Sequence, residues 1–352
     1  MPTSIRAMAV LCSTVLLSVL CGCAANDVAA PDLSGSSEYV ADTDLGSRGK
    51  PTPPPPQPTP CRIAYLNGNV FSMYTNGTGG LQLTSIGDNA RATRPDWSPD
   101  GQYIAFGLVD GLVEPTIASG IRRINAADGS NPVWITGGSP TSPTDDWVQW
   151  SPDGSWIAFS RIDLGNYKLC IVDPNVGESS VRLLWDYNPH CDDISPTWSP
   201  RGDMIAFVTM ETQSVDYDAL WVIDVGPDGA PVGEPRMLVD NEIGIGYIKS
   251  VDWSPVEDAD GNSRIAYDRV SPNYDIYVAT VDRSGALVGG PVNVTAGIAD
   301  KCGFPSWSPD GSEFAFGAQT KKSWQIRRMK WDGTGMTTVG PGSTPSWSPV
   351  LQ

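Results

Sequence analysis

A Trp-Ser-Pro triplet recurs along this chain and constrains its fold more than any other feature of the sequence. Its six copies begin at Trp97, Trp150, Trp198, Trp253, Trp307 and Trp347. Successive copies start between 40 and 55 residues apart. A period of this length is typical of β-propeller blades, because each repeat must be one unit that buries its apolar face against the next.

Each full copy contains four expected β-strands. The triplet ends the first strand, and turn sequences such as SPDG follow, with proline and glycine where a hairpin turn needs them. An apolar run comes next, such as IAF at Ile104 or FAF at Phe314. A third strand such as YKLCIVD and a short outer strand such as VRLLW complete the unit. Four strands are the content of one propeller blade.

The two ends of the repeat region complement each other. The last triplet, at Trp347, has no apolar run after it, and the first strand, CRIAYLN at 61–67, has no triplet before it. We expect residues 344–350 to supply the innermost strand of a sixth blade and residues 61–84 to supply its other three strands. Such pairing leaves the ring without an open edge. The sequence predicts an all-β, six-bladed β-propeller over residues 61–352 whose N- and C-terminal strands share the closing blade.

The six triplet tryptophans have an expected structural role. A large side chain at the end of each innermost strand fills the wedge between neighbouring blades, and burying one contributes about 2–3 kcal/mol. The alternative role for tryptophan, stacking on a carbohydrate, is open only to exposed residues such as Trp134, Trp156 and Trp324.

The first 22 residues have the pattern of a lipoprotein signal peptide. Arg6 precedes an apolar stretch at 7–20 that is too short for a comfortable membrane span. The following LCGC resembles a bacterial lipobox, which implies that Cys23 is lipidated. An ordinary secretory signal is the alternative. Ala24, the next residue, favours sorting to the outer membrane by the same resemblance.

Residues 23–60 are expected to form a lipidated cysteine and a disordered, proline-rich tether. Residues 24–49 have few large apolar side chains and cannot bury a core. The sequence KPTPPPPQPTP at 50–60 favours an extended polyproline conformation. The prediction is a protein bound to the membrane by its N-terminal lipid, without a transmembrane helix.

Four further cysteines follow the tether, at Cys61, Cys170, Cys191 and Cys302. An even number suits an oxidising compartment and allows three pairings. The short separation favours a Cys170–Cys191 disulfide, and buried free thiols are the alternative.

The net charge of −17 argues against nucleic acid and anionic lipid surfaces as partners. A net charge far from zero is also what keeps a domain in solution.

The repeated WSPDG and IAF elements, behind a secretory signal, resemble the TolB-type propeller. The resemblance covers residues 61–352 and implies that fold. Two copies depart from the motif, with SPRG at 199–202 and SPVEDADGN at 254–262. TolB itself has an α/β domain before its propeller, whereas this chain has a tether, so the role of TolB is not implied.

The sequence offers little for catalysis. The prolyl-oligopeptidase relatives that share this blade motif need a G-x-S-x-G nucleophile turn, which does not occur here. Pectin lyases of similar blade sequence hold a metal with a histidine cluster, and this chain has only His190. We expect no enzyme and no cofactor, except that Asp258 and Asp260 in the EDADG turn are a weak candidate for calcium.

The loops that enter the innermost strands are the candidate binding site, by analogy with other propellers. Strand alternation points the residue before each triplet tryptophan into the central channel. The candidate binding residues are Asp96, Asp145, Asp146, Gln149, Asp192, Asp193 and Asp252. Nearby basic residues are Arg91, Arg94, Lys249 and Lys301. A negative mouth suits a cation or a basic peptide segment. The alternative is a water-filled channel without a ligand.

The function predicted is that of a non-catalytic lipoprotein of the bacterial cell envelope. Its propeller would be a scaffold that binds an envelope protein or peptide. The alternative is a hydrolase or lyase of polysaccharide or peptide, with mouth carboxylates such as Asp145 and Asp192 as acid and base. A structural protein without a specific ligand is a third reading.

Overall fold

The computed structural model describes most of residues 61–349. The described ranges are 61–87, 90–110, 118–139, 141–163, 165–185, 191–211, 218–240, 247–270, 274–298, 300–321 and 323–349. The expected signal peptide (1–22), Cys23, the tether (23–60) and His190 lie outside them. Within these ranges, no helix has the length and apolar character needed to cross a membrane.

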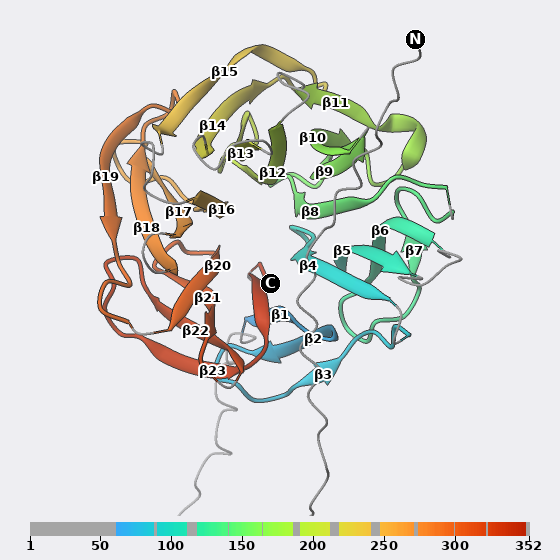
Figure 1. The fold of residues 1–352 in the computed structure, drawn as a ribbon, viewed down its shortest axis with the longest axis horizontal. Coiled ribbons are helices and arrows are strands. Elements are labelled where there is room, and N and C mark those ends of the chain that lie inside the picture. The colour runs from blue at the N-terminus through green and yellow to red at the C-terminus, as the bar shows by residue number, and fades with distance from the viewer. Residues whose placement is uncertain are drawn as a thin grey trace, which may run out of the picture. The chain divides into compact units, whose positions relative to one another are not determined.

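Six four-stranded antiparallel sheets are arranged around a central axis (Figure 1). Blade 1 contains β4 (Arg91–Trp97), β5 (Tyr103–Asp110), β6 (Ala118–Asn125) and β7 (Val133–Trp134). Blade 2 contains β8 (Asp145–Trp150), β9 (Ile157–Asp163), β10 (Asn166–Val172) and β11 (Arg182–Trp185). Blade 3 contains β12 (Cys191–Trp198), β13 (Met204–Glu211), β14 (Asp218–Val225) and β15 (Pro231–Asp240). Blade 4 contains β16 (Tyr247–Trp253), β17 (Ser263–Val270), β18 (Tyr274–Val281) and β19 (Leu287–Asn293).

Blade 5 contains β20 (Lys301–Trp307), β21 (Glu313–Gln319), β22 (Trp324–Lys330) and β23 (Thr337–Pro341). The closing blade contains β24 (Ser343–Trp347), β1 (Arg62–Asn67), β2 (Asn69–Tyr74) and β3 (Leu81–Gln82). A three-residue 3-10 turn, Glu178–Ser180, is the only helical element in the described ranges. The predicted all-β, six-bladed propeller is confirmed.

The closing blade joins the two ends of the propeller, as the sequence predicts. Figure 1 shows β24 beside β1, with Ile63 paired to Trp347 and Ala64 to Ser346. The backbone N–H of Arg62 donates to Ser348 Oγ at 2.8 Å. Within blade 1, the N–H of Tyr103 donates to Ser98 Oγ at 2.9 Å in the same way. The triplet serine therefore makes the same bond across the chain ends that it makes inside an uninterrupted turn.

The SPDG turns are held by their own side chains. In blade 1, Ser98 Oγ donates to Asp100 Oδ1 at 2.6 Å, and the same carboxylate accepts the N–H of Gln102 at 3.0 Å. In the SPRG copy the serine, Ser199, donates instead to Asp203 Oδ1 at 2.9 Å. The substituted motif keeps its turn because a carboxylate two residues further along accepts the hydroxyl.

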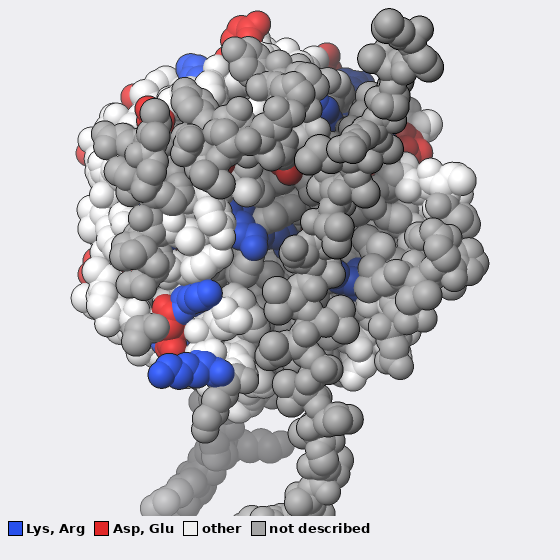
Figure 2. All heavy atoms as spheres, viewed as in Figure 1, with Lys and Arg blue, Asp and Glu red and all other residues white. Residues whose placement is uncertain are grey.

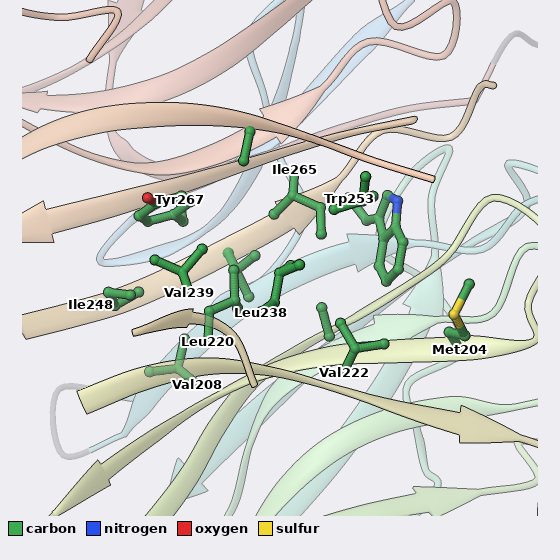
Figure 3. Packing of buried hydrophobic residues seen from close by; sticks show 14 of the residues in the cluster. Met204, Val208, Leu220, Val222, Leu238, Val239, Ile248, Trp253, Ile265 and Tyr267 are labelled. Atoms are coloured by element: carbon green, nitrogen blue, oxygen red, sulfur yellow. The ribbon is translucent and has the colours of Figure 1, made fainter. Parts of the chain in front are cut away.

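The hydrophobic core lies between blades. Figure 3 shows Leu220 and Val222 of blade 3 in the same cluster as Trp253 and Ile265 of blade 4. Each triplet tryptophan is less than 10% exposed and lies in a cluster with residues of the preceding blade. For Trp347 these include Ile326 of blade 5. The tryptophans thus occupy the wedge positions expected of them.

The structure contains no disulfide between Cys170 and Cys191, which corrects the favoured pairing. The two residues belong to different sheets, where Cys170 pairs with Phe159 in β9 and Cys191 with Glu211 in β13. Cys302 is a buried thiol in β20, and burial raises the pKa of its thiol to about 12.

Candidate functional site at the mouth of the central channel

The residue before each triplet tryptophan belongs to a ring of hydrogen bonds inside the channel, here called the polar belt. Its members are Asp96, Gln149, Thr197, Asp252, Ser306 and Ser346. The backbone N–H groups of Trp150, Trp198, Trp253, Trp307 and Trp347 donate to the belt side chain of the preceding blade, at 2.8–3.0 Å. Ser346 Oγ completes the ring by donating to Asp96 Oδ1 at 2.8 Å. The belt ties each blade to the next.

The belt also separates two cavities along the channel. Gln149 Nε2 crosses from blade 2 to donate to Asp252 Oδ1 of blade 4 at 2.8 Å. On the side where the innermost strands begin, a cavity of about 60 Å³ remains. On the other side, a cavity of about 310 Å³ is lined by the triplet tryptophans and prolines. Asp96, Gln149 and Asp252 line both cavities, so they do face the channel, but their polar atoms already hold the blades together.

Enclosure makes two belt carboxylates hard to ionise. Burial raises the pKa of Asp96 to about 7, against the opposing effect of bonds from Trp150 and Ser346. Burial likewise raises the pKa of Asp252 to about 6. Part of each side chain remains accessible through the channel. The folded state therefore binds more protons than the unfolded state between about pH 4 and pH 7.

The free energy of unfolding should consequently decrease as the pH rises through this range. We expect Asp96→Asn to make the decrease shallower between pH 5 and pH 8, because the amide cannot lose a proton. Urea unfolding at several pH values would measure both slopes. The control is Asp332→Asn, since the carboxyl of Asp332 lies in an exposed turn where hydrogen bonds from Thr334 lower its pKa. Equal slopes for wild type and Asp96→Asn would contradict the prediction.

A second ring of side chains lies nearer the mouth, and simple strand alternation does not predict it. In all six innermost strands, the pairing register with the next strand shifts around the residue that lies three positions before the triplet tryptophan. Five of the residues there have a positive φ: Arg94, Trp147, Ser195, Phe304 and Thr344. All five line the 60 Å³ cavity, together with Ser250 of blade 4. A β-bulge re-aims one side chain per strand, and here it turns a second residue of each strand into the channel.

The sequence carried a signal for these bulges. Proline stands two residues before the tryptophan in four strands, at Pro95, Pro196, Pro305 and Pro345. A proline within a strand is confined to edges and bulges because it cannot donate to the ladder. The ring that contains Trp147 and Phe304 could have been found from this pattern.

The described part of the mouth carries basic side chains as well as carboxylates. Arg94 lies in the cavity between the rings of Trp147 and Phe304. Lys249 lies 6.0 Å from the centre of the Phe304 ring, and Lys301 lies beside Tyr274. Figure 2 shows Lys and Arg atoms at the hollowed centre of this face. In the part of the mouth that the structure describes, positive side chains therefore stand beside the carboxylates of Asp96, Asp252 and Asp268, where only negative charge was expected.

The predicted carboxylates of blade 2 are committed to local bonds. Asp145 is fully buried and makes a two-bond pair with Arg161, at 2.7 and 2.8 Å. It faces the neighbouring blade, where Thr136 also donates to it. Asp146 Oδ1 accepts the N–H of Trp147 at 2.7 Å. Asp145 therefore presents no uncommitted charge to the channel, whereas the carboxylate of Asp146 acts electrostatically on Arg94.

Two further predicted residues lie in blade 3, and two in the turn of blade 4. Asp192 accepts the N–H of Tyr167 at 2.8 Å. Asp193 accepts the hydroxyl of Thr209 at 2.8 Å and lines a separate 170 Å³ pocket. Asp258 accepts the N–H groups of Asp260 and Asn262, at 3.0 and 2.9 Å. Within the described ranges, no group of three or more metal-ligating side chains comes together at this turn or elsewhere.

The buried carboxylate of Asp268 supports the mouth, and the sequence analysis missed it. Its Oδ1 accepts the N–H groups of Lys249 and Ser250, at 3.0 and 2.7 Å. Its Oδ2 accepts the Ser250 hydroxyl at 2.6 Å and faces the N–H of Phe304 at 3.3 Å. Asp268 thus fixes the backbone of two mouth strands in adjacent blades.

Sequence comparison does not assign this chain to a family. No model of a known protein family matches this chain. An uncharacterized protein of Agrobacterium fabrum is 29% identical over 181 residues, which make up 50% of this chain and 54% of that protein. The chain therefore spans about half the length of the curated relative it matches.

Solved structures define the class of fold. TolB from Acinetobacter baumannii matches with a TM-score of 0.57 and 18% identity, over 82% of this chain and 67% of that one. A putative TolB from Agrobacterium tumefaciens matches with a TM-score of 0.57 and 20% identity, over 81% and 90%. A chain of a nidogen–laminin complex matches with a TM-score of 0.57 and 10% identity, over 83% and 99%. The chain has a TolB-like six-bladed propeller fold, and this part of the predicted resemblance is confirmed.

Proposed function

We propose that this chain is a non-catalytic scaffold of the bacterial cell envelope that binds a protein or peptide at the mouth of its channel. The observation that carries the proposal is the second ring. Five residues, including Arg94, Trp147 and Phe304, take left-handed backbone conformations that turn their side chains into one cavity. Such conformations cost about 1–3 kcal/mol each and gather at functional sites.

Binding fits this site better than catalysis does. An enzyme of the alternative class needs two carboxylates free to exchange protons at a common substrate. Asp145 is paired with Arg161, and Asp192 accepts a backbone N–H from Tyr167. In addition, the same fold occurs in a chain of a nidogen–laminin complex, which is a protein–protein assembly. These observations favour a partner held by contacts over a substrate that is transformed.

The location belongs to the same proposal. The lipobox that ends at Cys23 would attach the protein to a membrane, and residues 24–60 would hold the propeller away from it. TolB proteins share the propeller fold, which is consistent with a site of action in the envelope.

Site-specific photocrosslinking tests the proposal in cells that make the full-length protein. A benzoylphenylalanine in place of Trp324, which lines a 180 Å³ pocket at the mouth, should form one discrete, saturable crosslink to a partner protein or peptide. The control position is Trp331, which is 41% exposed just beyond the opposite end of the same strand, β22. The same products from both positions, or none from either, would contradict a partner at the mouth.

A further inference from the structure

We propose that the mouth of the channel recognises a carboxylate on its peptide partner, and that Arg94 is the residue that contacts it. This inference rests on the proposed function and names the chemistry of the ligand. It reverses the expectation from sequence, which favoured a cation or a basic segment.

The first argument is that the Arg94 guanidinium has hydrogen-bond donors available for a ligand. Its guanidinium lies between the aromatic rings of Trp147 and Phe304, which come from blades 2 and 5. Stacking uses the faces of the guanidinium and leaves the N–H groups at its edge. Among the described residues, Arg94 has no ion pair and no side-chain hydrogen bond. A planar donor held in this way matches a carboxylate, which accepts two parallel bonds from it.

The second argument is electrostatic. Burial lowers the pKa of Arg94 to about 9, although the carboxylates of Asp146 and Asp268 act in the opposite direction. Burial, followed by repulsion from Arg94, also lowers the pKa of Lys249. The nearby carboxylate of Asp268 is already engaged by backbone donors. Asp146 and Asp268 do not offset the cost of burying Arg94, so an incoming carboxylate that bonds the guanidinium directly would stabilise its charged form.

The third argument is an unsatisfied group in the same cavity. The hydroxyl of Thr344, in β24, is buried and has no hydrogen-bond partner. Thr344 lines the 60 Å³ cavity together with Arg94. Leaving a buried polar group unsatisfied costs about 1–3 kcal/mol, which a ligand oxygen would recover. The cavity has room for a small polar head group, and the polar belt closes its floor.

The fourth argument concerns the rest of the ligand. Phe304 also lines the adjacent 180 Å³ pocket, together with Lys249, Lys301, Tyr274 and Trp324. A group that enters the Arg94 cavity must place its neighbour near this pocket. Three aromatic rings and two lysines suit an apolar or aromatic side chain beside the acidic group. A short acidic peptide segment, ending in the cavity with a side-chain or C-terminal carboxylate, fits both spaces.

The test uses the full-length protein in detergent and measures peptide affinity by tryptophan fluorescence, since Trp147 lies against Arg94. The probes are acetyl-Phe-Glu-Phe-amide, its glutamine counterpart, acetyl-Phe-Gly as the free acid, and galacturonate. We expect the glutamate peptide or the free acid to bind about tenfold more tightly than the glutamine peptide, and the stronger of the two identifies the source of the carboxylate. Binding of galacturonate alone would overturn the assignment of a peptide.

Substitutions test whether Arg94 makes the contact with the carboxylate. Arg94→Gln should remove the preference for the acidic probe, and Arg94→Lys should retain part of it, because lysine keeps the charge but not the planar donors. Arg123→Gln is the matched control, since Arg123 stacks on Tyr103 in the same blade but does not line the mouth cavity. If Arg94→Gln does not fold, Thr344→Val should weaken acidic binding about threefold.

The outcomes separate this inference from the proposed function. If a partner is crosslinked at position 324 but the protein binds the acidic and glutamine probes equally well, the carboxylate inference is refuted and the scaffold role remains. No crosslink and no binding of any probe would refute both.

Discussion

Deletion of residues 342–352 is expected to prevent cooperative folding of the propeller. The deletion removes β24, so β1 loses its partner strand and the ring has an open edge. It also removes the Trp347 side chain from the cluster that contains Ile63 and Ile326. Loss of a buried tryptophan alone costs about 3–5 kcal/mol, against a total stability of about 5–15 kcal/mol for a typical domain. Far-UV circular dichroism during heating would measure the loss.

A shorter deletion supplies the control for this experiment. Removing residues 350–352 leaves β24 and the bond from Arg62 to Ser348 in place, so its midpoint of unfolding should equal that of the wild type. A synthetic peptide of residues 342–352, added to the longer deletion, should restore part of the lost structure. A cooperative transition at the wild-type midpoint without residues 342–352 would show that closure contributes little to the fold.

Closure could be predicted from the sequence because the signals for it are local and repeated. The turn after each triplet, the apolar run and the incomplete repeats at the two ends can all be seen in the sequence. Ser348 shows why the inference works: its hydroxyl accepts the N–H of Arg62 in the way that Ser98 accepts that of Tyr103. Because the triplet serine makes the same hydrogen bond in a continuous turn and between the chain ends, the repeat predicts the geometry of the closing blade.

The site could be predicted only in part, because it depends on departures from the regular strand. Alternation correctly placed Asp96 and Asp252 in the channel. It did not foresee the bulges that add Arg94 and Trp147 to the channel lining. The basic side chain of Arg94 in the channel follows from this difference, while Asp145 is paired with Arg161 across its sheet. The sequence shows which charges exist, whereas bulges and partners decide which of them the channel presents.

Replacement of Arg161 by methionine is expected to destabilise the protein by about 3–5 kcal/mol, because it leaves the Asp145 carboxylate buried without its partner. The side chain of Asp145 is fully buried, and Arg161 also contacts Glu178 at 2.8 Å. Glu178 in turn accepts the N–H of Gly137 from the region that follows blade 1. The pair therefore connects two blades, and guanidinium unfolding of the variant would measure its contribution.

Arg328→Met is the matched control for the buried pair. Arg328 pairs with Glu313 at 2.9 Å, but both side chains are partly exposed, so the loss should be below about 1 kcal/mol. The double variant Arg161→Met/Asp145→Asn should recover part of the stability, because it removes the stranded charge. Burial already raises the pKa of Asp145 while Arg161 lowers it, so the single variant should lose less stability at pH 5 than at pH 8. Equal losses for Arg161→Met and Arg328→Met would contradict the prediction, because they would mean that burial adds nothing to the contribution of this ion pair to stability.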